Sequence, residues 1–192
     1  MPNMARLLIW LFCVLLACVP LRGPIKDHTP LLQSRWRARH FPIHVGVVND
    51  THVCRAQTVY QAVQKWNDVV KQAGGKRQVF QVHRVDEINL DRTGWIWVQE
   101  GRLPTTPEIV LGRCRLGYWT GTSEIWGSVV ILSRDHCNVR ATAHELGHAL
   151  GMRHAPCKSC TMYSKVPVIN GELSEEMEFQ PAETANVLRQ MR

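Results

Sequence analysis

The chain lacks several features that would assign it to particular classes of protein. Its 192 residues contain no internal repeat and no low-complexity tract, which excludes solenoids and tandem arrays. Acidic residues are scarce, with 16 Asp and Glu against 23 Lys and Arg. A marked apolar run at residues 7–17 is shorter than the roughly 20 residues that a membrane-spanning helix needs. The length instead suits one globular domain with a substantial core.

The deficit of acidic residues leaves a formal net charge of +7 and a pI near 9.3. Basic residues are densest at residues 35–40, which read Arg-Trp-Arg-Ala-Arg-His. A strongly basic chain can bind nucleic acid, but this chain carries no nucleic-acid-binding motif. We therefore expect no nucleic-acid partner, and we interpret the cluster as a solvated basic arm that can lie near anionic lipid.

The N-terminal residues have the pattern of an export signal. The short apolar run follows Arg6, as in the core of a signal peptide, so we predict such a peptide over residues 1–18. Residues 15–18, Leu-Leu-Ala-Cys, resemble a bacterial lipobox, in which Cys18 would be lipidated and would attach the chain to a membrane. The alternatives are an uncleaved anchor and plain secretion, either to the periplasm or outside the cell. A linker and basic arm are predicted over 19–40, followed by one domain over 41–192.

The richest pattern lies between His144 and His154. His144 and His148 are four residues apart, so a helix places both imidazoles on one face, where they can bind one metal ion. Gly151 can end that helix and allow the chain to deliver His154 as a third ligand. Three protein ligands leave one position for water, which is the arrangement of a catalytic zinc site. Glu145 would then act as the general base toward that water.

This pattern, His-Glu-x-x-His-x-x-Gly-x-x-His, resembles the signature of the metzincin clan of zinc endopeptidases. In that clan a methionine-containing turn follows, and its methionine forms an apolar floor beneath the metal without binding it. Met162 matches that position. Tyr163 directly follows it, a spacing that resembles the matrixins, in which this tyrosine belongs to the turn and is not catalytic.

The resemblance implies an α+β fold of the zincin type. It consists of a twisted mixed β-sheet with two main helices and a small C-terminal subdomain after Gly151, with the active-site cleft between the two parts. In the family an antiparallel edge strand borders the cleft and binds substrate as an added strand. Gly117, Tyr118 and Trp119 match that strand best, although an ordinary hairpin strand is the alternative.

The implied activity is that of an exported, monomeric zinc endopeptidase that holds one catalytic Zn²⁺ and acts on a protein or peptide substrate. Calcium is common in matrixins, but no compact calcium-binding loop appears in this sequence. Two other functions remain open: an archaemetzincin-like peptidase restricted to short peptides, and a zinc-holding protein that binds peptides without cutting them. The presence of Glu145 argues against the second, because a pure binding protein gains nothing from a base beside the metal.

Hydrophobic periodicity predicts the elements around this motif. The predicted strands are residues 41–48, 78–85, 94–99, 115–120 and 128–133, and a Gly-rich connection is predicted over 121–127. Helices are predicted over 56–73, after a cap at Asp135 or Asn138, and over 181–189. Trp66 lies on the apolar stripe of the first helix, so we expect it in the core, and His83 is interpreted as an ordinary strand histidine.

Seven cysteines suit an oxidising compartment. Two of them belong to the targeting segment, which leaves five and therefore at least one without a partner in the chain. A bridge from Cys157 or Cys160 to Cys137 would clamp the loop before Met162. The alternative is a second, structural zinc on these cysteines, as the resemblance to archaemetzincins implies. The sequence leaves the connectivity open.

Overall fold

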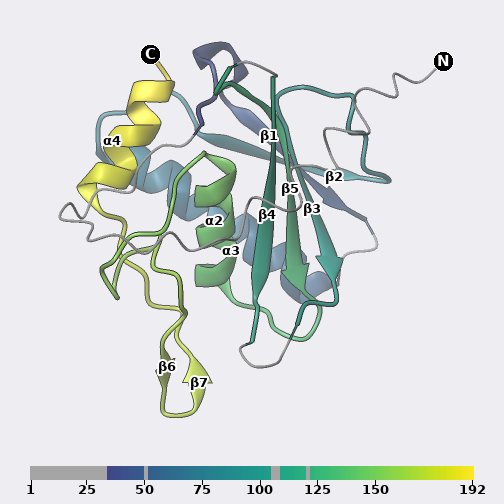
Figure 1. Ribbon diagram of the computed structural model, residues 1–192, viewed down its shortest axis with the longest axis vertical. Helices are drawn as coiled ribbons and strands as arrows, with labels where there is room; N and C mark the ends of the chain where they lie inside the picture. The colour runs from purple at the N-terminus through teal and green to yellow at the C-terminus, as the bar shows by residue number, and fades with distance from the viewer. Residues whose placement is uncertain (1–33, 50–51, 105–108, 120–121) are drawn as a thin grey trace.

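The computed structural model describes residues 34–49, 52–104, 109–119 and 122–192 (Figure 1). The predicted signal peptide, Cys18 and most of the predicted linker lie outside these residues. Among the helices that are described, none has both the length and the apolar character needed to cross a membrane.

The centre of the fold is a five-stranded mixed sheet in the order β2-β1-β3-β5-β4. Strands β1, β2, β3 and β5 are parallel to one another, and β4 is antiparallel to β5 at the edge (Figure 1). The strands are β1 (Ile43–Val48), β2 (Phe80–Val85), β3 (Trp95–Gly101), β4 (Gly112–Tyr118) and β5 (Ile125–Ser133). The predictions of an α+β class, a mixed sheet and an antiparallel edge strand are therefore confirmed.

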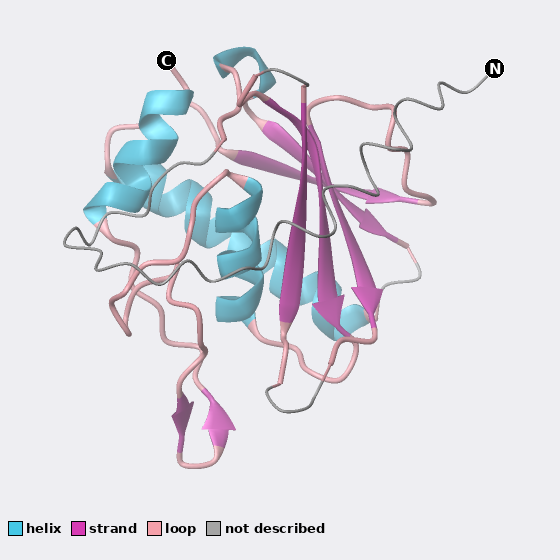
Figure 2. Cartoon of the chain, in the orientation of Figure 1, coloured by secondary structure: helices cyan, strands magenta, loops and turns pink. Residues whose placement is uncertain are grey.

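Three α-helices pack with this sheet, and Figure 2 shows them on one side of it. They are α2 (Val53–Gln72), α3 (Val139–Ala149) and α4 (Pro181–Gln190), and a short 3₁₀ helix, η1 (Ala38–His40), precedes β1. Apolar side chains of β1, β3 and β5 form one core cluster with those of the helices. Trp66 is 0% exposed, as predicted, and its Nε1–H donates to the carbonyl of Ala143 at 3.0 Å. This bond ties α2 to α3, the helix that carries the histidines.

Two strands begin before their predicted first residues. β4 begins at Gly112, three residues before its predicted start, and β5 begins at Ile125, inside the predicted Gly-rich connection. Neither extension shows simple apolar alternation. The added residues of β4 are held by backbone pairing with β5, and the added residues of β5 lie opposite a register shift between Gly117 and Tyr118. Cross-strand pairing is not visible to a periodicity argument along one segment.

The C-terminal part contains a hairpin that the periodicity did not predict. β6 (Val168–Ile169) and β7 (Glu172–Leu173) are joined by Asn170 and Gly171, both with positive φ. An Asn-Gly pair at a two-residue turn is a strong hairpin signal, so the signal was present in the sequence. The predicted terminal helix is confirmed as α4, which begins at Pro181.

Residues 34–40, assigned from sequence to an arm outside the domain, pack against it. Trp36 is 1% exposed, and its Nε1–H donates to the carbonyl of Ala149 at 2.8 Å. Its backbone N–H donates to Oε1 of Gln190, also at 2.8 Å. The folded domain therefore includes this segment, because a large aromatic side chain fixes it to α3 and α4.

Replacing Trp36 with Ala should lower the free energy of unfolding by about 3–5 kcal/mol, because it removes a buried aromatic side chain and leaves a cavity. Urea unfolding followed by circular dichroism would measure this change. Trp119→Ala is the matched control, since Trp119 is 42% exposed and its loss should cost far less. Equal stability of the two variants would show that the arm is not part of the folded domain.

Candidate metal centre

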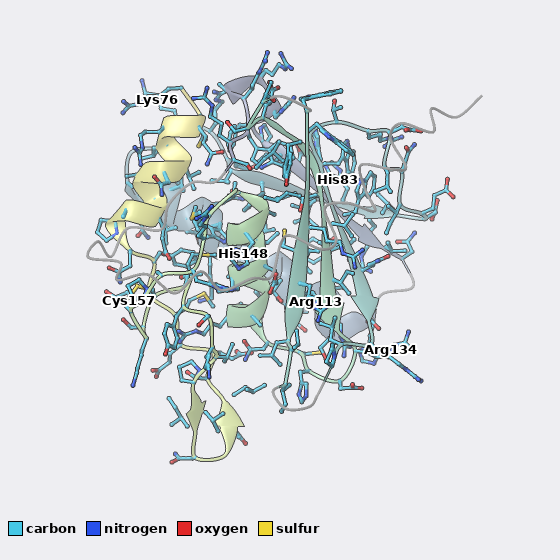
Figure 3. All side chains as sticks on the ribbon, in the orientation of Figure 1. Lys76, His83, Arg113, Arg134, His148 and Cys157 are labelled. Atoms are coloured by element: carbon cyan, nitrogen blue, oxygen red, sulfur yellow. A yellow bond between two sulfur atoms is a disulfide. The ribbon has the colours of Figure 1, made fainter. Side chains whose placement is uncertain are left out.

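The structure brings the three predicted histidine ligands together. His144 and His148 extend from one face of α3, and His154 follows after the helix has ended (Figure 3 labels His148 on α3). One nitrogen from each ring can be chosen so that all lie within 4.8 Å of one another. The Nε2 atoms of His148 and His154 are 3.1 Å apart. This arrangement could hold one metal ion, as the spacing of the motif predicted.

Two backbone carbonyls set the protonation of the ligand rings. Nδ1 of His144 lies 2.9 Å from the carbonyl oxygen of Thr161, and Nδ1 of His148 lies 2.7 Å from that of Met152. A carbonyl oxygen only accepts hydrogen bonds, so each Nδ1 must carry the proton. Each Nε2 then has a free lone pair that points into the cluster, which is the usual state of a metal-binding histidine.

The local sequence explains how α3 begins and where it stops. Asn138 caps the helix, its side chain accepting from the N–H of Ala141 at 2.8 Å, so this residue is the cap and Asp135 is not. Gly151 has φ 86°, and a Cβ at this position would lie 2.0 Å from the carbonyl oxygen of Ser34. Only glycine fits both the backbone angle and the space, and this turn allows the chain to return toward the helix with His154.

Burial keeps the histidines neutral. It lowers the pKa of His144 to about 3 and that of His148 to about 4, and it also lowers the pKa of His154. Repulsion among the three rings adds to the effect on His144 and His148. All three imidazoles are therefore unprotonated near neutral pH, the form that binds a metal.

Glu145 lies on the same helix, between the two histidine ligands in sequence, and faces β4. Its side chain is 7% exposed, and within the described part of the chain its Oε2 atom has no hydrogen-bond partner. Burial raises its pKa to about 8, while the charge of Arg113 acts in the opposite direction. A buried carboxyl oxygen without a partner is costly, so this atom is suited to bond a water or a ligand held in the site.

The first residue of β4, Gly112, packs closely against Glu145. A Cβ built on Gly112 would lie 2.5 Å from Cγ of Glu145 and 2.9 Å from its Oε1. The side chain of Glu145 therefore occupies space that only glycine leaves open. Gly112 was not identified from the sequence, because its role depends on the pairing register of β4 with β5.

Met162 packs against α3 at Gly147, on the side of the helix turned away from Glu145. It is 0% exposed, and its Sδ atom would be 2.2 Å from a Cβ at Gly147. Its backbone N–H donates to Oε1 of Glu183 at 3.0 Å, and its carbonyl accepts from the N–H of Ala155 at 2.7 Å. Met162 thus supports the helix through packing.

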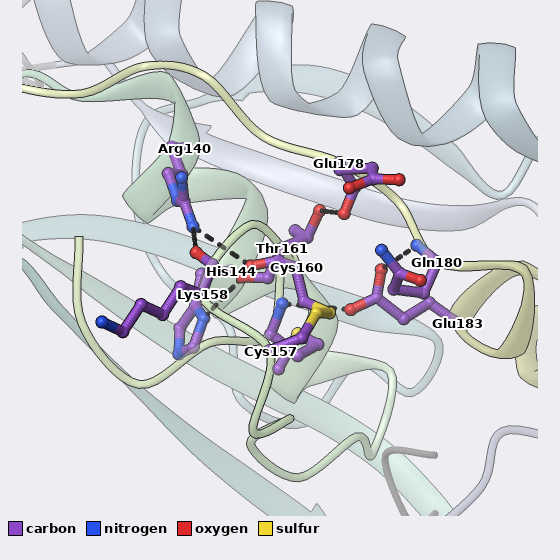
Figure 4. The surroundings of a disulfide bond; sticks show 10 residues. Arg140, His144, Cys157, Lys158, Cys160, Thr161, Glu178, Gln180 and Glu183 are labelled. Atoms are coloured by element: carbon purple, nitrogen blue, oxygen red, sulfur yellow. Dashed lines mark hydrogen bonds between the residues drawn. A yellow bond between two sulfur atoms is a disulfide. The ribbon is translucent and has the colours of Figure 1, made fainter. Parts of the chain in front are cut away.

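The loop before Met162 carries a disulfide between Cys157 and Cys160 (Figure 4). Of the possibilities that the sequence left open, this pairing excludes a bridge from either cysteine to Cys137; Cys137 is disulfide-bonded elsewhere, and Cys114 is free. Residues 157 and 160 are close because a turn joins them, with the N–H of Cys160 donating to the carbonyl of Cys157 at 3.2 Å. Joined in this way, the two sulfurs are not thiolate ligands for a second zinc.

Arg140 fixes the same loop to the start of α3 (Figure 4). Its Nη2 atom donates to the carbonyls of Lys158 at 2.7 Å and Cys160 at 3.2 Å, and its Nη1 donates to that of Glu176. The next residue, Thr161, supplies the carbonyl that orients His144. The loop therefore acts on the metal site through one backbone oxygen.

The three residues predicted to contact substrate lie at the far end of β4 from Gly112. Gly117 and Tyr118 are the last two residues of the strand, and Trp119 follows it. Tyr118 is 40% exposed and Trp119 is 42% exposed. Gly117 packs against Trp126, whose ring would be 2.6 Å from an added Cβ.

The residues present fit a divalent metal ion on two grounds of geometry and chemistry. Three neutral nitrogen donors converge, and the buried Oε2 of Glu145, the residue after His144, has no hydrogen-bond partner among the described residues. A set of imidazole nitrogens suits divalent transition metals, of which zinc is one. A comparison with models of known protein families found no match for the chain, and a comparison with curated proteins found none either.

Removing His148 should weaken the acid sensitivity of the metal-free protein. The folded-state pKa of His148 is about 4, below the ordinary value of about 6.5, so its protonation favours the unfolded chain and stability falls as pH drops through this interval. Glu145 has a raised pKa, so its contribution to the free energy of unfolding falls as the pH rises above the ordinary pKa of a glutamate. His148→Gln should therefore reduce the slope of unfolding free energy against pH by up to about 1.4 kcal/mol per pH unit.

Urea unfolding at several pH values, in the presence of a chelator, would measure these slopes. His52→Gln is a control, since His52 is exposed and precedes α2, whereas the ligands lie on and after α3. Parallel curves for the wild type and His148→Gln would contradict the buried, neutral state of this histidine.

Proposed function

We propose that this chain is a zinc-dependent endopeptidase with a metzincin-type fold. One observation carries the proposal: three converging imidazoles, two of them oriented by backbone carbonyls, lie on and just after the helix that holds Glu145, whose buried Oε2 has no partner among the residues that the structure describes. The antiparallel edge strand β4 supports it, because the resemblance leads us to expect such a strand.

Each residue of the site has a definite task in this reaction. When bound, a divalent ion supplies a Lewis acid and a water of lowered pKa, and its charge favours the ionised form of Glu145. His144, His148 and His154 hold the ion through their Nε2 atoms. Glu145 accepts the proton of the attacking water at Oε2 and then donates it to the leaving amine. Burial of this carboxyl places it in a low dielectric, where hydrogen bonding to the reacting groups is strong.

The edge strand provides a place for an extended peptide. Among the described residues β4 pairs on one side only, with β5, so its other side can accept a substrate as an added antiparallel strand. Gly112 marks the part of this edge that lies against the general base. We propose that the bond to be cleaved lies near this end and that Gly117, Tyr118 and Trp119 contact the substrate farther along. Export, attachment through Cys18 and the monomeric state remain predictions.

The Glu145→Gln variant tests the mechanism. It should retain about one zinc per chain, because the ligands are unchanged, yet hydrolyse casein at least about 10²-fold more slowly, since the general base is lost. Zinc content by atomic absorption and release of casein fragments would be measured together. Full activity in this variant would exclude Glu145 as the base, and zinc loading without any cleavage by the wild type would favour a peptide-binding protein.

Short synthetic peptides distinguish the remaining alternative. An endopeptidase with an open edge strand should cleave both casein and a short peptide, whereas cleavage of the short peptide alone would favour an archaemetzincin-like activity.

The Gly112→Ala variant tests the position of the base. Its added methyl group would displace the Glu145 side chain, and a displacement of about 1 Å can reduce catalysis about 10²-fold. Zinc content should stay unchanged. Gly101→Ala is the matched control, because it also introduces a contact of 2.5 Å, but with Ile131 on the neighbouring strand. An equal loss of activity per folded molecule in both variants would mean that strain in the sheet, and not displacement of Glu145, is the cause.

A further inference from the structure

A basic hollow lies at the end of the domain where the described chain begins. Its volume is about 590 Å³, and it lies between residues 35–39, residues 122–124 of the β4–β5 connection and the end of α4. Figure 1 shows η1 and the end of α4 together at the top of the view. Its arginines are Arg35, Arg37, Arg39, Arg189 and Arg192.

One carboxylate, Glu124, faces these five arginines in the lining of the hollow. It pairs with Arg37 and, at 3.3 Å, with Arg39, and it is itself largely buried. No carboxylate of the described residues forms an ion pair with Arg35, Arg189 or Arg192 within 4.0 Å. The surface therefore keeps a strong positive charge that the described residues do not neutralise.

The arginines are held in place and face outward. The N–H of Arg35 donates to the carbonyl of Ser123 at 2.9 Å, and its own carbonyl accepts from Ile125 at 2.8 Å. Between Arg35 and Arg37, the side chain of Trp36 points into the core. This alternation keeps the guanidinium groups on the surface, so little backbone ordering is needed when an anionic partner binds.

More basic residues occupy the same end of the domain. Arg77 donates to the carbonyls of Met191 at 2.6 Å and Ala38 at 3.5 Å, which places it beside the hollow. Figure 3 shows Lys76 at this end as well. A broad surface of positive charge suits a broad anionic partner better than a single small ion.

We propose that this basic end is a docking surface for a bilayer that contains anionic phospholipid. Two observations favour a bilayer over nucleic acid. The aromatic residue of the cluster, Trp36, is buried and cannot stack on bases. The chain also enters the domain at this surface, after the predicted linker that follows the export signal or lipid anchor. An anchor there would bring this end toward the lipid headgroups, and one anchor combined with a basic surface gives stable attachment. The surface is independent of the proposed peptidase activity.

Vesicle co-sedimentation of the full chain tests this docking surface. The vesicles are phosphatidylcholine alone or an equal mixture of phosphatidylcholine and phosphatidylglycerol, both at low salt. The triple variant Arg35→Gln, Arg189→Gln, Arg192→Gln should bind the mixed vesicles about a hundredfold more weakly than the wild type. Binding to phosphatidylcholine alone, which reports any apolar or lipidated N-terminal segment, should not change.

The matched control removes the same charge elsewhere, through Lys65→Gln, Arg84→Gln and Arg134→Gln; Figure 3 shows Arg134 at the opposite end of the molecule from Lys76. This control should retain wild-type binding, and thermal unfolding should show that both variants are folded. An equal loss in both triple variants would attribute binding to net charge and overturn the proposal, as would wild-type binding that does not depend on phosphatidylglycerol. Release from the vesicles by inorganic phosphate, but not by chloride at equal ionic strength, would indicate a site for a single anion instead.

Discussion

The candidate metal centre depends on two hydrogen bonds from histidine rings to backbone carbonyls. The carbonyl of Thr161 orients His144 and that of Met152 orients His148, and each forces the proton onto Nδ1. One carbonyl follows the disulfide loop and the other lies in the turn after α3. The helix stop at Gly151 and the loop held by Arg140 thus contribute directly to the site, because they place these two oxygens.

Close packing around α3 gives the site its rigidity. Two glycines allow neighbours to approach where any side chain would collide: Gly147 accommodates the sulfur of Met162, and Gly112 accommodates the carboxyl of Glu145. The helix is therefore held from two sides, by the C-terminal part of the chain and by the edge strand. Burial in this packing also explains the opposite pKa shifts of the histidines and Glu145, since a low dielectric disfavours every charged form. A bound cation would reverse that preference for the carboxyl group.

The fold gathers five arginines at one end of the domain, the surface proposed to dock on a membrane. The arginines around the hollow come from the first described segment and from the end of α4, which are far apart in the sequence. Trp36 joins them by bonding to both Ala149 and Gln190. The same contact that completes the core therefore assembles the basic surface, at the end of the domain opposite the β6–β7 hairpin in Figure 1.

The sequence by itself determined the three histidines, Glu145, the helix stop at Gly151 and the order of the five sheet strands and the three α-helices. These features are local: a helical period places His144 and His148 on one face, and a positive φ calls for glycine. Only the tertiary structure decided that Cys157 pairs with Cys160, that Gly112 lies against Glu145 and that Arg35 lies near Arg189. Each of these depends on how distant segments pack or on how a loop turns, and hydrophobic periodicity along one segment carries no information about either.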